Sequence, residues 1–165
     1  MLPPKLIMSP IDFSGHSEEA LKAATDLAFC FGSELCLVHV VPAIPKLPAA
    51  TTIFREGEYE EELHKDAEKR LNEMVQKIAE RGLKGFAIVG TANDVSMELL
   101  RIAERNNVDL IVIATHGMTG WHKLAFGSVA EKVVRLATCP VLVLRAQPET
   151  ESQQTSRAAS VAVSH

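Results

Sequence analysis

The sequence predicts one α/β domain built on an open, doubly wound, five-stranded parallel sheet with helices on both faces. Apolar runs of strand length alternate along the chain with stretches in which apolar residues recur every three or four positions. One run, Val108–Thr115, is almost wholly apolar, as a strand covered on both faces must be. The length of 165 residues is enough for a single domain with a substantial core.

The first part of the chain predicts two strands around a helix. The expected strands are Lys5–Ile11 and Glu34–Val41, both apolar and of ordinary strand length. Between them, Ser14–Phe31 carries apolar residues at helical spacing and acidic residues in its first turn. Gly32 is placed to end this helix.

A proline-rich stretch and a long helix follow. We expect Pro42–Glu58, with three prolines and no clear period, to form a surface loop that could act as a flap. Glu58–Arg81 predicts an amphipathic helix whose charge runs from acidic to basic. Its apolar face consists of Leu63, Ala67, Leu71, Met74, Val75 and Ile78.

The second half of the chain repeats the alternation of strands and helices. A strand is expected within Gly82–Gly90, and either Asn93 or Asp94 can cap a helix that runs through Glu104. The remaining expected elements are the strand Val108–Thr115, a helix from Gly127 to about Ala137, and the strand Cys139–Arg145.

This order of elements implies right-handed crossovers and a Rossmann-like sheet with strand order 3-2-1-4-5, counted along the chain. In such a sheet, ligands bind beyond the carboxyl ends of the strands where the order reverses, here between the first and fourth strands. We expect the domain to span residues 1–145. Residues 146–165, rich in Ser, Gln, Thr and Ala, are expected to form a flexible tail.

Composition narrows the class of protein. The net charge of −4 and a pI near 5.9 argue against a nucleic-acid binder. The chain contains no apolar run near the roughly 18 residues of a membrane span and does not begin like a signal peptide, so we expect a cytoplasmic protein. Its three cysteines lack metal-binding spacing and are expected to be reduced core thiols: Cys30, Cys36 and Cys139.

The stretch "IVIATHGMTGWHKLAFGSVAEKVV", residues 111–134, predicts a buried strand, a glycine-punctuated loop and a helix. The start of that helix offers unpaired N–H groups and the positive end of the helix dipole to an anion. Gly127 allows close approach to the backbone, Gly117 permits a sharp exit from the strand, and Gly120 keeps the loop pliable. The pattern therefore favours a phosphate site.

Other interpretations of the same residues stay open at this point. Ser128–Glu131 reads as a capping box, so Ser128 could simply cap its own helix. Asp12, at the end of the first strand, could cap the next turn or accept hydrogen bonds from a ribose or base. The ordinary interpretation of four further residues is exposed loop, although Lys123 could pair with a phosphate: His116, Trp121, His122 and Lys123.

Several nucleotide and hydrolase motifs do not occur in the sequence. It contains no G-x-x-x-x-G-K-[ST], no G-x-G-x-x-G after the first strand and no G-x-S-x-G. Only His116 and Asp12 could position water for hydrolysis, and neither has an evident partner in sequence. Any turnover of ATP is expected to be far below roughly 1 per second.

The chain resembles the universal stress protein family from about Lys5 to Arg145. The stretch "IMSPIDFSGHSEEAL" looks like the opening strand and helix of that family, and "CPVLVLR" looks like its closing strand. Nucleotide-binding members carry G-x2-G-x9-G-[ST]. In this register Gly117, Gly127 and Ser128 match, while Ala114 stands at the first glycine position.

The resemblance implies a homodimer through the last strand, Val141–Arg145, and a site for ATP, or ADP or AMP, with Mg²⁺ or Mn²⁺ on the phosphates. It assigns Asp12 to the adenosine, with backbone or apolar contacts from Pro10, Ile11 and Val40. It assigns Ile113 and Ala114 to the floor, and the phosphates to Gly117, Gly127, Ser128, Val129 and Ala130.

The function implied by the resemblance is that of a cytoplasmic ATP-binding stress-response protein that acts as a sensor or regulator. The alternative, favoured by Ala114, is a dimeric interaction module of the same fold that binds no nucleotide. A further protein partner stays open under both interpretations.

Overall fold

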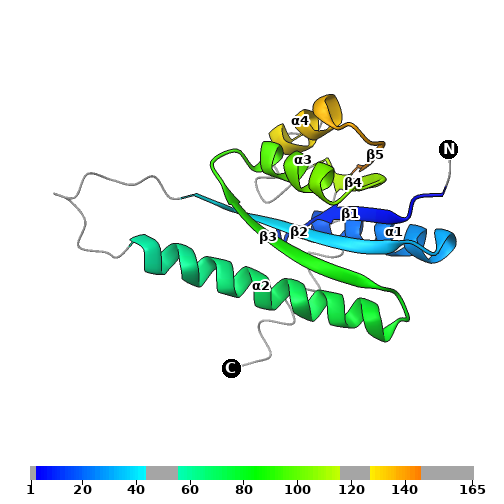
Figure 1. Ribbon diagram of the computed structural model, residues 1–165, viewed down its shortest axis with the longest axis horizontal. Coiled ribbons are helices and arrows are strands. Elements are labelled where there is room, and N and C mark those ends of the chain that lie inside the picture. Colours follow the sequence, from blue (N-terminus) through cyan, green and yellow to red (C-terminus); the bar gives the residue numbers. More distant parts are fainter. Residues whose placement is uncertain (1–2, 44–55, 116–126, 146–165) are drawn as a thin grey trace, which may run out of the picture.

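The computed structural model describes residues 3–43, 56–115 and 127–145, and all structural statements refer to these residues. It contains one five-stranded parallel sheet of order β3-β2-β1-β4-β5, which confirms the predicted fold class and strand order (Figure 1). The strands are β1 (Leu6–Pro10), β2 (Glu34–Pro42), β3 (Gly85–Ala92), β4 (Leu110–Ala114) and β5 (Val141–Leu144). The helices are α1 (Gly15–Phe31), α2 (Glu56–Glu80), α3 (Val95–Arg105) and α4 (Ser128–Leu136).

The sheet separates two apolar clusters because successive side chains of each strand point to opposite faces. On one face, Ile7 and Leu37 pack with residues of α1 and α2 such as Ala24 and Leu71. On the other face, Met8 packs with residues of α3 and α4 that include Leu99 and Val133. The helices therefore cover the sheet in pairs, α1 with α2 and α3 with α4 (Figure 1).

Local capping explains where the helices begin and end. Ser14 is the N-cap of α1, and its hydroxyl accepts a hydrogen bond from the Ser17 N–H. Gly32 ends α1 in the left-handed conformation, with φ 67°, as predicted. Of the two candidates at the start of α3, Asp94 is the cap, because its carboxylate accepts from the Met97 N–H.

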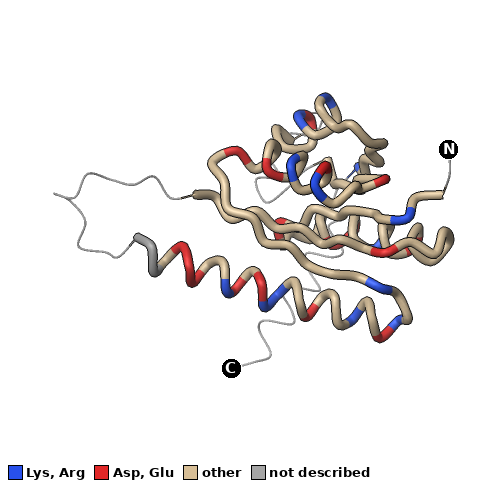
Figure 2. Tube along the Cα trace, viewed as in Figure 1, with Lys and Arg blue, Asp and Glu red and all other residues tan. Residues whose placement is uncertain are grey.

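Two side-chain placements differ from the sequence prediction. Leu63 of α2 is 37% exposed, so the apolar face of this helix is buried only further along, from Ala67 onward. Cys30 is exposed and is not a core thiol, whereas Cys36 is buried and burial raises its pKa to about 12. Figure 2 shows charged residues spread along α2, as expected for a helix with one face in solvent.

The loop predicted over Pro42–Glu58 is shorter at both ends, because Pro42 is the last residue of β2 and α2 already begins at Glu56. Residues 44–55 between them and the predicted tail of residues 146–165 lie outside the described residues. None of the helices within the described residues is long and apolar enough to cross a membrane.

One buried hydroxyl gives a test of the core. Ser9 of β1 is 0% exposed, and its Oγ has no hydrogen-bond partner in the part of the chain that the structure describes. An unpaired buried hydroxyl costs stability, so Ser9→Ala should raise the free energy of unfolding by up to about 1 kcal/mol, measured by urea denaturation.

The matched control is Ser33→Ala. Ser33 is also buried, at 3% exposed, but its hydroxyl donates to the Pro4 carbonyl oxygen at 2.6 Å. Its removal should lower the free energy of unfolding by about 1 kcal/mol. A destabilised Ser9→Ala protein would show that this hydroxyl has a partner in solution.

Candidate functional site

The carboxyl ends of β1 and β4 form the point at which the strand order reverses, since β2 and β5 flank these strands on opposite sides. In β1 and β4, Ile7 is paired with Leu110 and Met8 with Ile111, whereas β1 is paired with β2 along its whole length, from Leu6 to Pro10. The pairing of β1 with β4 therefore ends before the last residues of these two strands. A ligand crevice is expected at this position in this class of sheet.

The beginning of α4 is held against the end of β4 by a backbone hydrogen bond. The Gly127 N–H donates to the Thr115 carbonyl oxygen at 2.6 Å, and the Thr115 N–H donates to the Leu144 carbonyl oxygen at 2.8 Å. Thr115 and Gly127 are thereby held in contact. Gly127 is the N-cap residue of α4, with extended backbone angles of φ −62° and ψ 146°.

The first turn of α4 supplies donors for an anion. The first intrahelical hydrogen bond joins the Glu131 N–H to the Gly127 carbonyl oxygen at 2.9 Å. Helix geometry then leaves the N–H groups of Ser128, Val129 and Ala130 without an intrahelical acceptor. These three N–H groups, together with the helix dipole, face the direction from which the chain enters the helix.

The interpretation of Ser128 as the cap of its own helix is wrong. Ser128 is already the first helical residue, it is exposed, and α4 has no side-chain cap hydrogen bond. The reason is the bond to Thr115, which fixes Gly127 in the extended conformation of an N-cap. No side chain of the cap residue therefore occupies the donors of the first turn.

Asp12 occupies the turn between β1 and α1. Its Oδ1 accepts from the Ser14 N–H at 3.0 Å and from the Ser14 hydroxyl at 2.5 Å. The capping interpretation of Asp12 is therefore correct. It does not exclude a ligand role, because an ionised carboxylate has about four lone-pair sites and can accept from several donors at once.

Four of the predicted site residues belong to the same apolar cluster. Val40, Ile113 and Ala130 are buried there, and Val129 packs against them. Ile11 lies differently: its side chain is buried in the cluster on the α1 and α2 face. Its N–H donates to the Val38 carbonyl oxygen at 2.8 Å, so Ile11 is fixed at the end of β1.

The remaining predicted residues are at strand ends or outside the described part of the chain. Pro10 is the last residue of β1, and Ala114 is the last residue of β4, in register with Leu144. Gly117 lies outside the described residues, as do His116, Gly120, Trp121, His122 and Lys123.

The structure also forms an ion pair that the sequence analysis did not predict. Lys132 of α4 pairs with Asp94 at the start of α3, with Nζ 2.5 Å from Oδ2. The hydrogen bond from Lys132, followed by those from the Met97 N–H and the Ser96 hydroxyl, lowers the pKa of Asp94 to about 2. A separation of 38 residues gives this pair no local sequence signal.

A second unpredicted group surrounds Phe13. Its ring centroid lies 4.6 Å from that of His39 and 3.7 Å from the guanidinium carbon of Arg70. Phe13 also has a positive φ of 62°, which is rare for a bulky residue. A hydrophobic residue next to an aspartate gives no indication of this backbone conformation.

No group of three or more His, Cys, Asp or Glu residues that could hold a metal ion occurs among the described residues. The polar groups of the candidate site are chiefly the backbone N–H donors of α4 and the Asp12 carboxylate, which is an acceptor. This combination suits a ligand that is anionic at one end and donates hydrogen bonds at the other.

The fold and the site together define a doubly wound α/β protein with a helix N-terminus at its topological switch point. Residues 4–145 match the family model of the Universal stress protein family. Because this match covers most of the chain, the protein belongs to that family.

Individual relatives agree with this assignment. The chain is 36% identical over 151 residues to Universal stress protein MJ0531 of Methanocaldococcus jannaschii, which covers 89% of this chain and 85% of the relative. The solved structure of the hypothetical protein MJ0577 from the same organism superposes with a TM-score of 0.76 at 26% identity, covering 90% of this chain and 100% of that one.

A universal stress protein from Archaeoglobus fulgidus was solved in complex with dAMP. It superposes with a TM-score of 0.59 at 22% identity, covering 87% of this chain and 98% of that one. At this identity the likeness shows the shared fold, and the nucleotide belongs to the Archaeoglobus protein.

The ion pair between Asp94 and Lys132 should make the thermal stability of the protein depend on pH below about pH 4. The pKa of Asp94 is lowered from 3.8 to about 2 in the folded protein, so its stabilising contribution is fully present above pH 3.8 and is lost as the pH falls towards 2. Asp94→Asn should therefore lower the thermal midpoint at pH 6 but leave it unchanged near pH 2.

The matched control for this pH series is Asp66→Asn, which removes the partner of an exposed ion pair within α2 whose atoms are 3.9 Å apart. This variant should behave like the wild type. An equal difference between Asp94→Asn and wild type at pH 6 and pH 2 would contradict the assigned ion pair.

Proposed function

We propose that this protein is a cytoplasmic ATP-binding stress-response protein that acts as a nucleotide-dependent sensor or regulator. The observation that carries the proposal is the first turn of α4: three N–H donors, no side-chain cap, and a backbone bond that places them at the end of β4. Membership of the Universal stress protein family and the dAMP complex of the Archaeoglobus relative support it.

In this proposal the phosphates bind at the first turn of α4. The N–H groups of Ser128, Val129 and Ala130 donate to phosphate oxygens, and the helix dipole adds favourable electrostatic energy. Gly127 brings the backbone close because it has no Cβ. Gly117, outside the described residues, is the remaining phosphate residue in the family pattern.

The adenosine part lies over the end of β1 and β4 in the same proposal. Asp12 accepts hydrogen bonds from the ribose or base through its carboxylate. Val40, Ile113 and Ala114 supply the apolar floor, and Pro10 and Ile11 shape the end of β1. An apolar floor with a few fixed polar groups is typical of small-ligand sites.

A divalent ion, Mg²⁺ or Mn²⁺, would neutralise part of the phosphate charge. Mg²⁺ commonly keeps several waters and binds through phosphates and one or two carboxylates, which fits a site whose described residues hold no larger cluster of metal ligands.

We also propose a homodimer formed by antiparallel pairing of Val141–Arg145 with a second copy. β5 is the outermost strand on its side of the sheet, and its Leu142 is 40% exposed. An apolar edge strand that stays open invites association. A second function, a dimeric interaction module without nucleotide, is favoured by Ala114, whose methyl group stands where nucleotide-binding members have glycine.

The nucleotide released from the protein distinguishes these two functions. Protein purified without added nucleotide and then denatured should release ATP, ADP or AMP in near-equal molar amount, identified by chromatography and mass spectrometry. Release of no nucleotide, together with no calorimetric signal on adding ATP and Mg²⁺, would favour the interaction module.

Gly127→Asp should abolish ATP binding, with a loss of affinity of at least about a hundredfold, because it places a negative charge and a competing acceptor beside the phosphates. The variant should fold, since Gly127 has ordinary extended angles and Asp is a favoured N-cap residue. Isothermal titration calorimetry measures the affinity, and circular dichroism the fold.

Gly127→Asn is the matched control, because it adds a similar cap without the charge. Its affinity should fall less than that of the aspartate variant. Unchanged ATP affinity in Gly127→Asp would refute the placement of the phosphates at α4.

Ala114→Gly should raise ATP affinity by up to about tenfold, because it removes the methyl group that departs from the family pattern. Ala92→Gly makes the same change at the end of β3, away from the proposed site, and should leave the affinity unchanged. Binding that exists only in the Ala114→Gly variant would show that the natural chain is the interaction module.

A further inference from the structure

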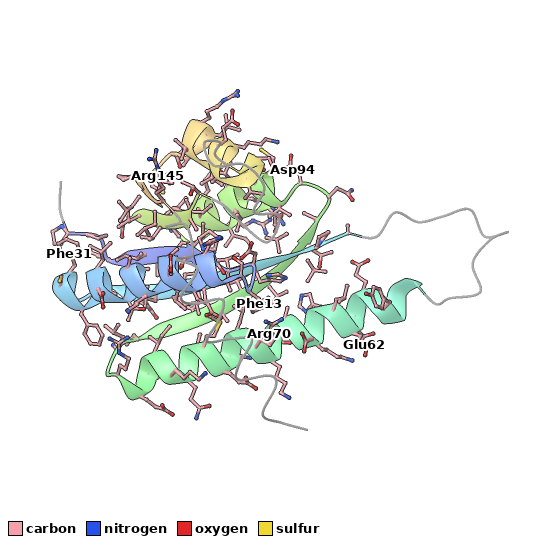
Figure 3. All side chains as sticks on the ribbon, turned by 180° about the vertical axis from the view of Figure 1, so that it is seen from behind. Phe13, Phe31, Glu62, Arg70, Asp94 and Arg145 are labelled. Carbon is pink, nitrogen blue, oxygen red and sulfur yellow. The ribbon has the colours of Figure 1, made fainter. Side chains whose placement is uncertain are left out.

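The turn that carries Asp12 is contacted by a cluster of three side chains, Phe13, His39 of β2 and Arg70 of α2. The ring of Phe13 lies 4.6 Å from that of His39 between centroids, with the planes tilted by 38°, and the guanidinium carbon of Arg70 lies 3.7 Å from the Phe13 ring centroid. In Figure 3, Phe13 and Arg70 are seen next to each other between α1 and α2. This cluster joins the turn after β1, the strand β2 and the helix α2, which are separated in sequence.

The backbone of Phe13 sets the position of the Asp12 carboxylate. Phe13 has φ 62°, a conformation that bulky residues rarely adopt and that the surrounding structure must stabilise. Asp12 precedes it, and Ser14, whose N–H and hydroxyl both donate to Asp12, follows it. A change in the Phe13 backbone would therefore separate Asp12 from its two donors.

His39 fixes the same turn from the other side. Its Nδ1 lies 2.7 Å from the Ile11 carbonyl oxygen. A carbonyl oxygen only accepts, so Nδ1 carries the proton and donates. The Ile11 N–H donates to the Val38 carbonyl oxygen at 2.8 Å, so both polar groups of Ile11 are bonded to β2. β2 thus anchors Ile11, the residue before Asp12, while His39 and Arg70 contact Phe13, the residue after Asp12.

Arg70 connects the turn to α2. Its side chain is 48% exposed, and it also forms a long ion pair with Asp66 of the same helix, with 3.9 Å between Arg70 Nη1 and Asp66 Oδ2. Exposed pairs of this kind contribute little. The contact with the face of Phe13 is a cation–π interaction, which is directional and depends on where α2 lies.

We propose that Arg70 and Phe13 are positioning residues for Asp12, so that adenosine affinity depends on how α2 is seated against the turn. This inference rests on the proposed nucleotide function for its binding readout. It assigns a role in the site to α2, a helix that contributes no predicted ligand contact. Any partner or modification that displaces α2 would weaken adenosine binding through the same contact.

The chain offers a matched control for this proposal. Arg81 directly follows the last residue of α2, and its guanidinium carbon lies 5.2 Å from the ring centroid of Phe29, at the far end of α1 from Asp12. Arg70→Met should weaken ATP binding about threefold, as expected for one partly exposed cation–π contact, whereas Arg81→Met should leave the affinity unchanged. Arg70→Lys, which keeps the cation, should restore part of the lost affinity.

A double-mutant cycle tests whether Arg70 acts through Asp12. Once Asp12→Asn has removed the charged ligand contact, Arg70→Met should cause no further loss of affinity. Phe13→Leu should give about the same loss as Arg70→Met, and the two together should give no more than either alone. Additive losses throughout the cycle would show that Arg70 acts independently of Asp12 and would overturn the proposal.

Amide hydrogen exchange gives a readout that needs no nucleotide. In the ligand-free protein, Arg70→Met should accelerate exchange of the Ser14 N–H, which is bonded to Asp12, while Arg81→Met should not. If the wild type binds no ATP, the proposed function fails and this experiment still decides the positioning role. If the wild type binds ATP and the two arginine variants behave alike in both assays, the positioning role fails and the proposed function stands.

Discussion

The site depends on one backbone hydrogen bond, from the Gly127 N–H to the Thr115 carbonyl oxygen at 2.6 Å. It brings the end of a buried strand and the beginning of a helix into contact. By fixing Gly127 as the N-cap, it leaves the first-turn donors of α4 without a side-chain cap from the described part of the chain. Buried or partly buried N–H groups need partners, so this geometry calls for an acceptor from outside the helix.

The two faces of the sheet contribute different parts of the site. On the face covered by α3 and α4, the pair Asp94–Lys132 ties the two helices together and so supports the position of the α4 N-terminus. On the other face, α1 and α2 support the turn that carries Asp12. A ligand between β1 and β4 would contact both halves, which is how small side-chain contacts on either face can influence its affinity.

Ala114 stands where nucleotide-binding members of the family have glycine, so family membership alone does not decide whether this protein binds a nucleotide. The fold and the family are shown by the strand order and by the match over residues 4–145. Function depends on the residues of the site and not on the fold alone. The methyl group of Ala114, the last residue of β4, belongs to the proposed floor of that site. The N–H donors of α4 favour the proposed nucleotide site, whereas the Ala114 methyl group favours the interaction module. We favour the nucleotide site, because three hydrogen bonds to phosphate would contribute more binding free energy than one methyl contact would cost.

The sequence by itself determined the fold class and the strand order, and it predicted the position of a nucleotide site. Alternating apolar periodicity required a parallel sheet with helices on both faces, and Gly32, Asp94 and Gly127 marked helix ends through local backbone chemistry. Only the tertiary structure decided that Ser128 does not cap α4, that Phe13 takes a left-handed conformation, and that Arg70 and Lys132 have partners on other elements. Periodicity and capping depend on neighbours within a few residues, whereas these features depend on contacts between segments that only the folded sheet brings together.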